Sequence, residues 1–442
     1  MLIPMSISTK LNSLKNHSGF IRYFKNTSWL LGEKVIRLTV SLFVGIWVAR
    51  YLGPERFGLF SYAQSFVGLF VVIATLGLDA IVVRELVKNE SKKDALLGTA
   101  FVLQLAGAFI VLLFLAIAIN FTSNDTSTNT LVFIIASATI FQSFNVIDYY
   151  FQSKVLSKYV VYANIITLLI SSIIKIALII NEAPLVTFAY VILFDSIVLS
   201  LGFLYFYLHE HLSFRTLKFE ASLALSLLKD SWPLILSGVV ISIYMKIDQV
   251  MIKEMLGPGA VGQYAAAARL SEAWYFIPVV ICSSLFPALI NIKKKSKELY
   301  YARLQKLYDL MVWLGLSVAL PVAFLSDWII GFLYGEQYSQ AGSVLIIHIW
   351  AGVFVFLGVA CGKYLTAENF TKKYFHRTLF GAILNVVLNY VLIPKYGISG
   401  AAIATLTGQF AANYAYDFFD PDLHSQLRMK TKSFFPIHLL RT

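Results

Sequence analysis

The chain has 442 residues, of which 58% are hydrophobic and 14% charged, and its mean hydropathy is +0.73. Soluble proteins of this size are far more polar, so the composition predicts an integral membrane protein. Apolar runs of roughly 20 residues recur, which predicts spanning helices rather than strands. The formal net charge of +12 raises the question of a nucleic-acid partner, which depends on where the basic residues lie.

We expect an all-α protein with about twelve spanning helices. A basic lead over residues 1–25 has no apolar core and no small-residue cleavage site, so no cleaved signal peptide is expected. An N-terminal six-helix lobe over 26–208 contains helices at 26–50, 58–79, 96–120, 130–152, 160–181 and 184–208. A polar linker over 209–230 follows. A C-terminal six-helix lobe over 231–418 contains helices at 231–255, 261–289, 307–331, 340–362, 378–394 and 399–418, and a tail over 419–442 ends the chain.

The Lys and Arg residues are concentrated in alternate connections. The lead, the tail and the connections 79–95, 152–160, 209–230, 290–306 and 363–377 hold 27 of the 36. The opposite connections hold four, and the other five lie inside predicted helices. Because retained Lys and Arg mark the cytoplasmic side, we expect both termini in the cytoplasm. The net charge then reflects membrane topology, and we expect no nucleic-acid partner.

One motif occurs twice, 204 residues apart, as LGPERFGLF over 52–60 and LGPGAVGQY over 256–264. The first glycine of each copy suits a left-handed helix end, and the proline suits the first turn of the next helix. We therefore predict two structural hairpin tips from a duplicated six-helix unit, in a parallel repeat around a central cavity. Such halves can rock in a transporter, although a channel would also be compatible with the duplication. The shared motif residues are Gly53, Pro54, Gly58, Gly257, Pro258 and Gly262.

Ionisable residues inside the predicted helices are the candidate functional residues. A charge at the centre of a bilayer costs at least about 2.5 to 3.5 kcal/mol unless it faces a cavity or a partner. The candidates for a substrate cavity are Arg37, Lys175, Lys246, Arg269 and Glu272. The candidates for ion coupling are Glu33, Asp148, Asp195 and Asp248. Cations at these depths would suit an anionic, phosphate-bearing substrate.

Simple pairing competes with a functional role for several of these charges. Glu33 and Arg37 are four residues apart on one helix face, and Lys175 could pair with Asp195 of the next helix. Two further residues in the second half, Lys246 and Asp248, are only two positions apart and cannot face each other. Arg269 and Glu272 can pair at a spacing of three. The positions 204 residues away from Glu33, Arg37, Arg269 and Glu272 carry no charge. This asymmetry between the two copies favours a functional role for these charges over a structural one.

The remaining polar features favour packing. Cys282 and Cys361 have neither metal spacing nor a disulfide framework, and we expect no metal and no cofactor. His348 stands alone in an apolar helix and is more typical of a packed histidine than of a proton relay. Asn385 and Asn389, one turn apart, could join helices or line the cavity.

Four stretches carry a family resemblance: VARYLGPERFGLFSYAQ over 48–64, GLDAIVVREL over 77–86, the segment 246–272 and YGISGAAIAT over 396–405. Together they resemble the polysaccharide-export family of oligosaccharide flippases. These are the O-antigen, or Wzx-type, translocases of the multidrug, oligosaccharidyl-lipid and polysaccharide exporter superfamily. The matches are spread over residues 26–418.

The resemblance implies two six-helix lobes in a bacterial inner membrane. It implies movement of an undecaprenyl-diphosphate-linked oligosaccharide from the cytoplasmic to the periplasmic leaflet, with membrane lipids and other polysaccharide assembly proteins as partners. It also implies a cationic cavity, which Arg37, Lys175 and Arg269 could supply. The membrane potential, or counter-movement of H⁺ or Na⁺ through Asp148, Asp195 or Asp248, could drive the transport.

Two alternatives remain open. A multidrug or cation antiporter of the same superfamily would need acids rather than bases in its cavity. A membrane glycan polymerase or ligase would share the hydropathy, but the predicted outer connections have roughly ten residues or fewer, too short for a large periplasmic domain. The sequence shows no catalytic constellation, so we expect a protein that is not an enzyme.

Overall fold

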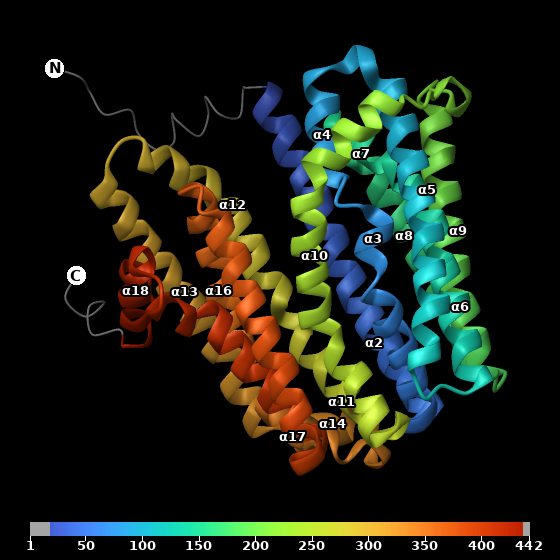
Figure 1. Cartoon of the computed structure of the whole chain (residues 1–442), viewed down its shortest axis with the longest axis vertical. Coiled ribbons are helices and arrows are strands. Elements are labelled where there is room, and N and C mark those ends of the chain that lie inside the picture. The colour runs from blue at the N-terminus through green and yellow to red at the C-terminus, as the bar shows by residue number, and fades with distance from the viewer. Residues whose placement is uncertain (1–17, 436–442) are drawn as a thin grey trace. The chain divides into compact units, whose positions relative to one another are not determined.

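The structure is a computed structural model that describes residues 18–435 (Figure 1). Most of the predicted lead and the last seven residues of the tail lie outside this range. Every regular element in the described range is a helix, which confirms the all-α prediction. Ten of its helical segments are long and apolar enough to cross a membrane.

Two of the ten segments are long enough to cross twice. Ser28–Gly68 has 41 residues and Thr371–Phe418 has 48, against about 20 for one crossing. Each is interrupted by a glycine with non-helical backbone angles, Gly53 in the first and Gly397 in the second. Counting each as two crossings brings the total in the described range to twelve, in agreement with the predicted number.

The helices follow one another with short connections, several of which contain a single 3₁₀ turn. The first group comprises α2 (Ser18–Gly68), α3 (Val71–Thr75), α4 (Asp79–Lys88), α5 (Lys93–Ala118), α6 (Thr126–Phe141), α7 (Val146–Ser153), α8 (Ser157–Ile180), α9 (Leu185–His209) and α10 (Ala221–Leu256). The second comprises α11 (Pro258–Glu272), α12 (Phe276–Lys293), α13 (Lys297–Phe324), α14 (Ser326–Tyr334), α15 (Ala341–His348), α16 (Ala351–Ala367), α17 (Thr371–Asn413) and α18 (His424–Phe434).

Helices extend into segments that hydropathy assigned to connections. The predicted connection 79–95 contains α4, and α10 begins at Ala221 rather than at 231. Helix α13 begins at Lys297, ten residues before its predicted start, and Ser296 caps it by accepting a hydrogen bond from the Leu299 amide. Charged residues interrupt these turns, such as Lys229 and Asp230 in α10, so an apolar window ends before the helix does.

The chain forms two compact units. Unit 1 comprises the chain up to Val44 together with Val71–Ile117 and Phe133–Ile235, and unit 2 comprises Gly45–Phe70, Ala118–Val132 and the chain from Leu236 onward. Helices α2 and α10 therefore contribute to both units. The lobes at 26–208 and 231–418 follow other boundaries, and that division stays a prediction.

Each unit has its own apolar core. In unit 1, buried side chains of α4, α5, α7 and α9 meet, among them Leu96, Phe151 and Tyr207. In unit 2, α12, α13 and α16 pack side by side around Met311 and Phe356 (Figure 1). The two predicted packing cysteines lie in this second core as free thiols.

The two copies of the Leu-Gly-Pro motif cross within unit 2. Gly53 has φ 70° and ψ 169°, and Gly257 has φ 90° and ψ 175°, a conformation open almost only to glycine. A β-carbon on Gly58 would lie 1.8 Å from the Pro258 carbonyl oxygen, and one on Gly262 would lie 2.0 Å from the Pro54 oxygen. The contact is thus reciprocal and joins backbone to backbone, so only glycine fits.

The tail folds back onto unit 2 as helix α18, which packs against α13. Its Lys430 is fully buried and forms an ion pair of 2.7 Å with the buried carboxylate of Asp417. The Lys430 ammonium also donates to the Asn413 carbonyl at 2.8 Å. A buried pair of this kind tolerates removal of both charges better than removal of one.

We predict that Lys430→Met lowers the free energy of unfolding by about 3 to 5 kcal/mol, because Asp417 would keep a buried charge without a counter-ion. Adding Asp417→Leu should restore most of the loss. Unfolding of the purified protein in detergent measures both changes. As a matched control, Lys373→Met should lower the free energy of unfolding by less than about 1 kcal/mol. One of the two carboxylate partners of Lys373, Asp422, is 67% exposed. Equal losses at the two lysines would contradict the prediction.

Candidate functional site

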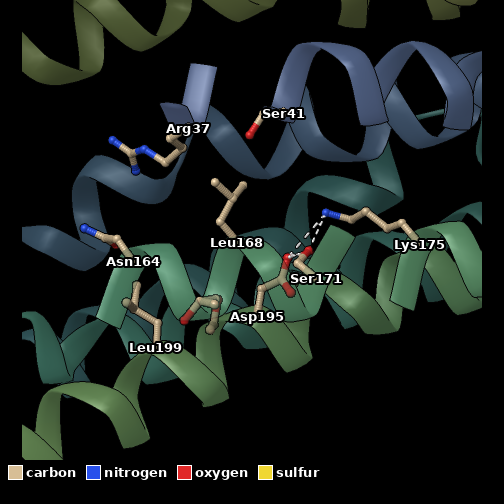
Figure 2. A pocket seen from close by; sticks show the side chains of 10 residues that line it. Arg37, Ser41, Asn164, Leu168, Ser171, Lys175, Asp195 and Leu199 are labelled. Atoms are coloured by element: carbon tan, nitrogen blue, oxygen red, sulfur yellow. Dashed lines mark hydrogen bonds and ion pairs between the residues drawn. The ribbon is translucent and has the colours of Figure 1, made fainter. Parts of the chain in front are cut away.

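A polar pocket lies inside unit 1, between α2, α8 and α9 (Figure 2). Its volume is 240 Å³. Only two of the ten lining residues are apolar. The lining residues are Arg37 and Ser41 from α2; Asn164, Thr167, Leu168, Ser171 and Lys175 from α8; and Asp195, Ser196 and Leu199 from α9.

Helix α8 supplies the polar wall because its polar residues share one face. Asn164, Thr167, Ser171 and Lys175 are spaced by three or four residues, so they form one stripe along the helix. On a membrane-spanning helix, such a stripe faces protein or water rather than lipid.

Lys175, Ser171 and Asp195 form a closed hydrogen-bonded group at one end of the pocket (Figure 2). The Lys175 ammonium donates to the Ser171 hydroxyl at 2.7 Å and lies 3.5 Å from Asp195 Oδ2. The Ser171 hydroxyl in turn donates to Asp195 Oδ2 at 2.7 Å. Asp195 Oδ1 has no hydrogen-bond partner in the described part of the chain. The group is therefore charge-balanced but keeps one acceptor open.

Arg37 lies at the other end of the pocket, beside Asn164 (Figure 2). Its Nε is 3.0 Å from Glu33 Oε1, the pair at a spacing of four that the sequence allows. The Arg37 side chain is 50% exposed, whereas that of Glu33 is 6% exposed. The buried carboxylate thus anchors a guanidinium that remains accessible from the pocket, and the pocket has a cation at each end.

Asp148 lies outside this pocket. Helix α7 carries it, and the Gln152 side chain donates to its Oδ2 at 3.0 Å. The negative charge of Glu33 repels the Asp148 carboxylate, and no basic side chain in the described range forms an ion pair with Asp148. Asp148 therefore does not join Asp195 in one site.

Asp248 lies in a second site, inside unit 2, between α10, α11 and α17. It is 4% exposed. Its Oδ2 accepts hydrogen bonds from Tyr264 at 2.8 Å and Thr405 at 2.5 Å, and its Oδ1 accepts one from Asn389 at 2.5 Å. The Asn389 amide also donates to Asn385 at 3.2 Å. Neutral donors alone surround this carboxylate among the described residues, so a proton or a small cation could balance its charge.

A pocket of 10 Å³ adjoins Asp248, large enough for a single water-sized occupant. Glu272, His348 and Gln409 are among its other lining residues. His348 is buried and packs edge-on against the Tyr264 ring at 5.8 Å. Two acids and no lysine or arginine line this pocket, which makes it suited to a cation rather than to an anion.

Arg269 does not pair with Glu272, although their spacing permits it. Its guanidinium lies over the Phe57 ring at 4.6 Å and donates to Gln64 Oε1 at 3.3 Å. Lys246 is partly exposed and has no carboxylate within ion-pair distance among the described residues. Neither Arg269 nor Lys246 therefore forms an ion pair with the acids that line the Asp248 pocket, among the described residues.

Sequence reasoning missed the hydroxyl partners of Asp248. Tyr264 belongs to the second Leu-Gly-Pro copy and Thr405 ends the YGISGAAIAT stretch, and neither pattern indicates a role in a polar site. The turn-spaced Asn385 and Asn389 were the available signal for a polar site. The hydrogen bond from Asn389 to Asp248 joins α17 to α10, and Asn385 accepts a hydrogen bond from Asn389 within α17.

The described range holds ten apolar segments long enough to span a membrane, two of them long enough to cross twice, and these segments define a multi-pass membrane protein. The sequence model of the family described as "Polysaccharide biosynthesis protein" matches residues 23–293, and that of "MatE" matches residues 233–391. The first match covers more than half of the chain. The chain therefore belongs to the polysaccharide biosynthesis protein family, within the superfamily of multidrug and polysaccharide exporters.

Relatives and solved structures agree with this assignment. The "Capsular polysaccharide biosynthesis protein CapF" of Staphylococcus aureus is 20% identical over 403 residues, covering 89% of this chain and 98% of CapF. An inward-facing multidrug resistance transporter of the MATE family is similar with a TM-score of 0.76 and 16% identity, over 89% of this chain and 95% of that one. The lipid II flippase MurJ is similar with a TM-score of 0.69 and 16% identity, over 93% and 92%. These last two likenesses show the fold.

Proposed function

We propose that this protein flips a lipid-diphosphate-linked oligosaccharide, with an undecaprenyl lipid, from the cytoplasmic to the periplasmic leaflet of a bacterial inner membrane. The product would serve the synthesis of O-antigen or another surface polysaccharide. Family membership and the name of CapF support the polysaccharide pathway. The single observation that carries the proposal is the unit 1 pocket, which holds two cations within spanning helices.

The pocket suits a diphosphate that is linked to a sugar. Arg37 offers a planar fork of donors that matches phosphate oxygens, and Lys175 offers a compact positive charge. When no substrate is bound, Asp195 and Ser171 hold Lys175 and prevent an unpaired charge. An arriving phosphate can compete for the ammonium while Ser171 keeps its bond to Asp195. The neighbouring Asn164, Ser41 and Thr167 side chains provide donors and acceptors for sugar hydroxyls.

The second candidate function is export of a cation or a cationic drug. The acidic site around Asp248 and Glu272, within the segment matched by the MatE family, favours it. Under this alternative, substrate enters unit 2 and the cations of the unit 1 pocket are structural. The two functions therefore predict different phenotypes for changes at Lys175.

Deleting the protein should cause lipid-linked repeat units to accumulate on the cytoplasmic leaflet. Restoring it with Arg37→Gln or Lys175→Gln should lower the flipping rate at least about tenfold, because a hydrogen bond to a charged group contributes roughly 1.5 to 3 kcal/mol. The fraction of lipid-linked units accessible from the cytoplasmic side of inverted vesicles measures this rate.

The matched control is Lys158→Gln, since Lys158 lies on the same helix but contacts the Tyr159 ring rather than the pocket. It should flip at the rate of the unchanged protein. Absence of accumulation after deletion would reject the flippase proposal. Full activity of both pocket variants at normal abundance would instead restrict these cations to a structural role.

We further propose alternating access, with the crossing of the two Leu-Gly-Pro turns as the outer gate. The crossing supports this idea because it joins corresponding points of the two sequence copies. The contact consists of backbone atoms at two glycines, so it can separate without breaking a buried ion pair. In the outward-open state the two turns would move apart.

Gly58→Ala should prevent close approach of the turns and keep the outer gate open. In a cysteine-free background, a Val261→Cys reporter should then react faster with a membrane-impermeant thiol reagent, because Val261 is fully buried when the turns are in contact. Gly32→Ala is the matched control, since no atom lies within 4 Å of the added methyl group. Equal labelling rates in the two variants would reject the gate.

We also propose that Asp248 binds the proton or sodium ion whose movement drives transport. Its neutral surroundings and the adjoining pocket for one small occupant support the idea. The membrane potential alone is the alternative, since two negative charges moving outward would gain about 4.6 kcal/mol per 100 mV.

Asp248→Asn should abolish the dependence of flipping on an imposed Na⁺ or proton gradient, because the amide cannot carry the exchanged charge. Flipping rates in vesicles with the gradient imposed and then collapsed measure this dependence. Asp148→Asn, which changes a carboxylate outside the site, should retain it. If the unchanged protein flips equally fast with both gradients collapsed, ion coupling at Asp248 is wrong.

A further inference from the structure

An apolar groove lies in unit 2 between α12 and α13, and it shares no lining residue with either polar site. Its volume is 320 Å³, within the usual range of roughly 300 to 1,000 Å³ for ligand pockets. Each helix lines it with one stripe at spacings of three and four residues, which faces the other helix. The stripes are Leu285, Ala288, Leu289 and Ile292 on α12, and Arg303, Lys306, Leu307 and Leu310 on α13.

Two cations stand at one end of this apolar groove. Arg303 and Lys306 are exposed, and no carboxylate lies within ion-pair distance of either in the described part of the chain. Two acids of the flanking segments are already engaged: Glu368 pairs with Lys293 at 2.9 Å, and Asp309 is buried against Ser433. The groove thus combines an unneutralised positive end with a wall of aliphatic side chains.

The position of the groove favours a lipid as its occupant. Leu285 and Leu310 are each 42% exposed on spanning helices, so the apolar part opens toward the bilayer. A basic turn with Lys294 and Lys295 precedes α13, and Arg303 and Lys306 lie about two turns into this helix. By the positive-inside rule this turn faces the cytoplasm, where the leaflet is rich in anionic headgroups.

We propose that this groove binds an anionic phospholipid of the cytoplasmic leaflet. The phosphate lies between Arg303 and Lys306, and one acyl chain lies along the Leu285 and Leu310 stripes. Opposite charge at the mouth selects an anionic headgroup over a zwitterionic one. The site is independent of the proposed transport substrate, because none of its residues lines the unit 1 pocket or the Asp248 site.

Native mass spectrometry of the purified full-length protein tests the site, with phosphatidylglycerol and phosphatidylcholine as the probes. The unchanged protein should bind phosphatidylglycerol more tightly. The double variant Arg303→Gln/Lys306→Gln should bind it about 30-fold more weakly, given the contribution of two basic residues near an anionic headgroup. Ala288→Phe, which fills the groove without changing any charge, should also weaken phosphatidylglycerol binding.

The matched control is Lys294→Gln/Lys295→Gln, which removes the same charge from the adjacent turn but leaves the groove lining intact. Its affinity should stay within about threefold of that of the unchanged protein. Equal weakening in both double variants would show a general effect of net charge and overturn the proposal. Equal affinity for both lipids would overturn it too. Displacement of phosphatidylglycerol by an equimolar lipid-linked diphosphate oligosaccharide would assign the groove to that substrate instead.

Discussion

The absence of water in a bilayer core constrains every ionised side chain on the spanning helices, because each must find a counter-ion or donors inside the protein. Unit 1 meets this constraint with ion pairs, such as Lys175 with Asp195 and Arg37 with Glu33. Unit 2 meets it differently at Asp248, where hydroxyl and amide donors surround the carboxylate. In the proposed function, the first arrangement supplies cations to an anionic substrate, and the second supplies an acid to a small cation.

The helical fold and its number of crossings could be predicted from the sequence because the bilayer forces long apolar runs and the motif recurs. The helix ends could not, because charged residues interrupt the beginnings of α10 and α13. The contacts of Arg269 could not be predicted from the sequence either. Its spacing from Glu272 suggested a local pair, whereas its contacts with Phe57 and Gln64 depend on packing between segments about 205 residues apart.

The candidate sites were predictable in part. Depth in the membrane identified Lys175, Asp195 and Asp248 as charges that need an explanation, and the cost of an unpaired charge is the physical reason. Which residues surround them depends on helix rotation, which hydropathy does not define. Helix α18 was missed for a related reason: its sequence is polar, and its buried face is held by polar contacts, which are Gln426 with Tyr308, Lys430 with Asp417 and Ser433 with Asp309.

The glycines of the backbone contact occur in both copies of the Leu-Gly-Pro motif, whereas the charges of the two sites do not recur. A contact between two backbones related by the repeat needs a glycine on each side, and Gly58 and Gly262 both meet that requirement. A charge that serves one substrate or one ion needs no second copy. At the 204-residue offset, the position equivalent to Asp248 is Val44, and that equivalent to Thr405 is Leu201. A repeated fold can therefore hold two unlike sites, with cations in unit 1 and acids in unit 2, as exchange of an anionic headgroup for a small cation would require.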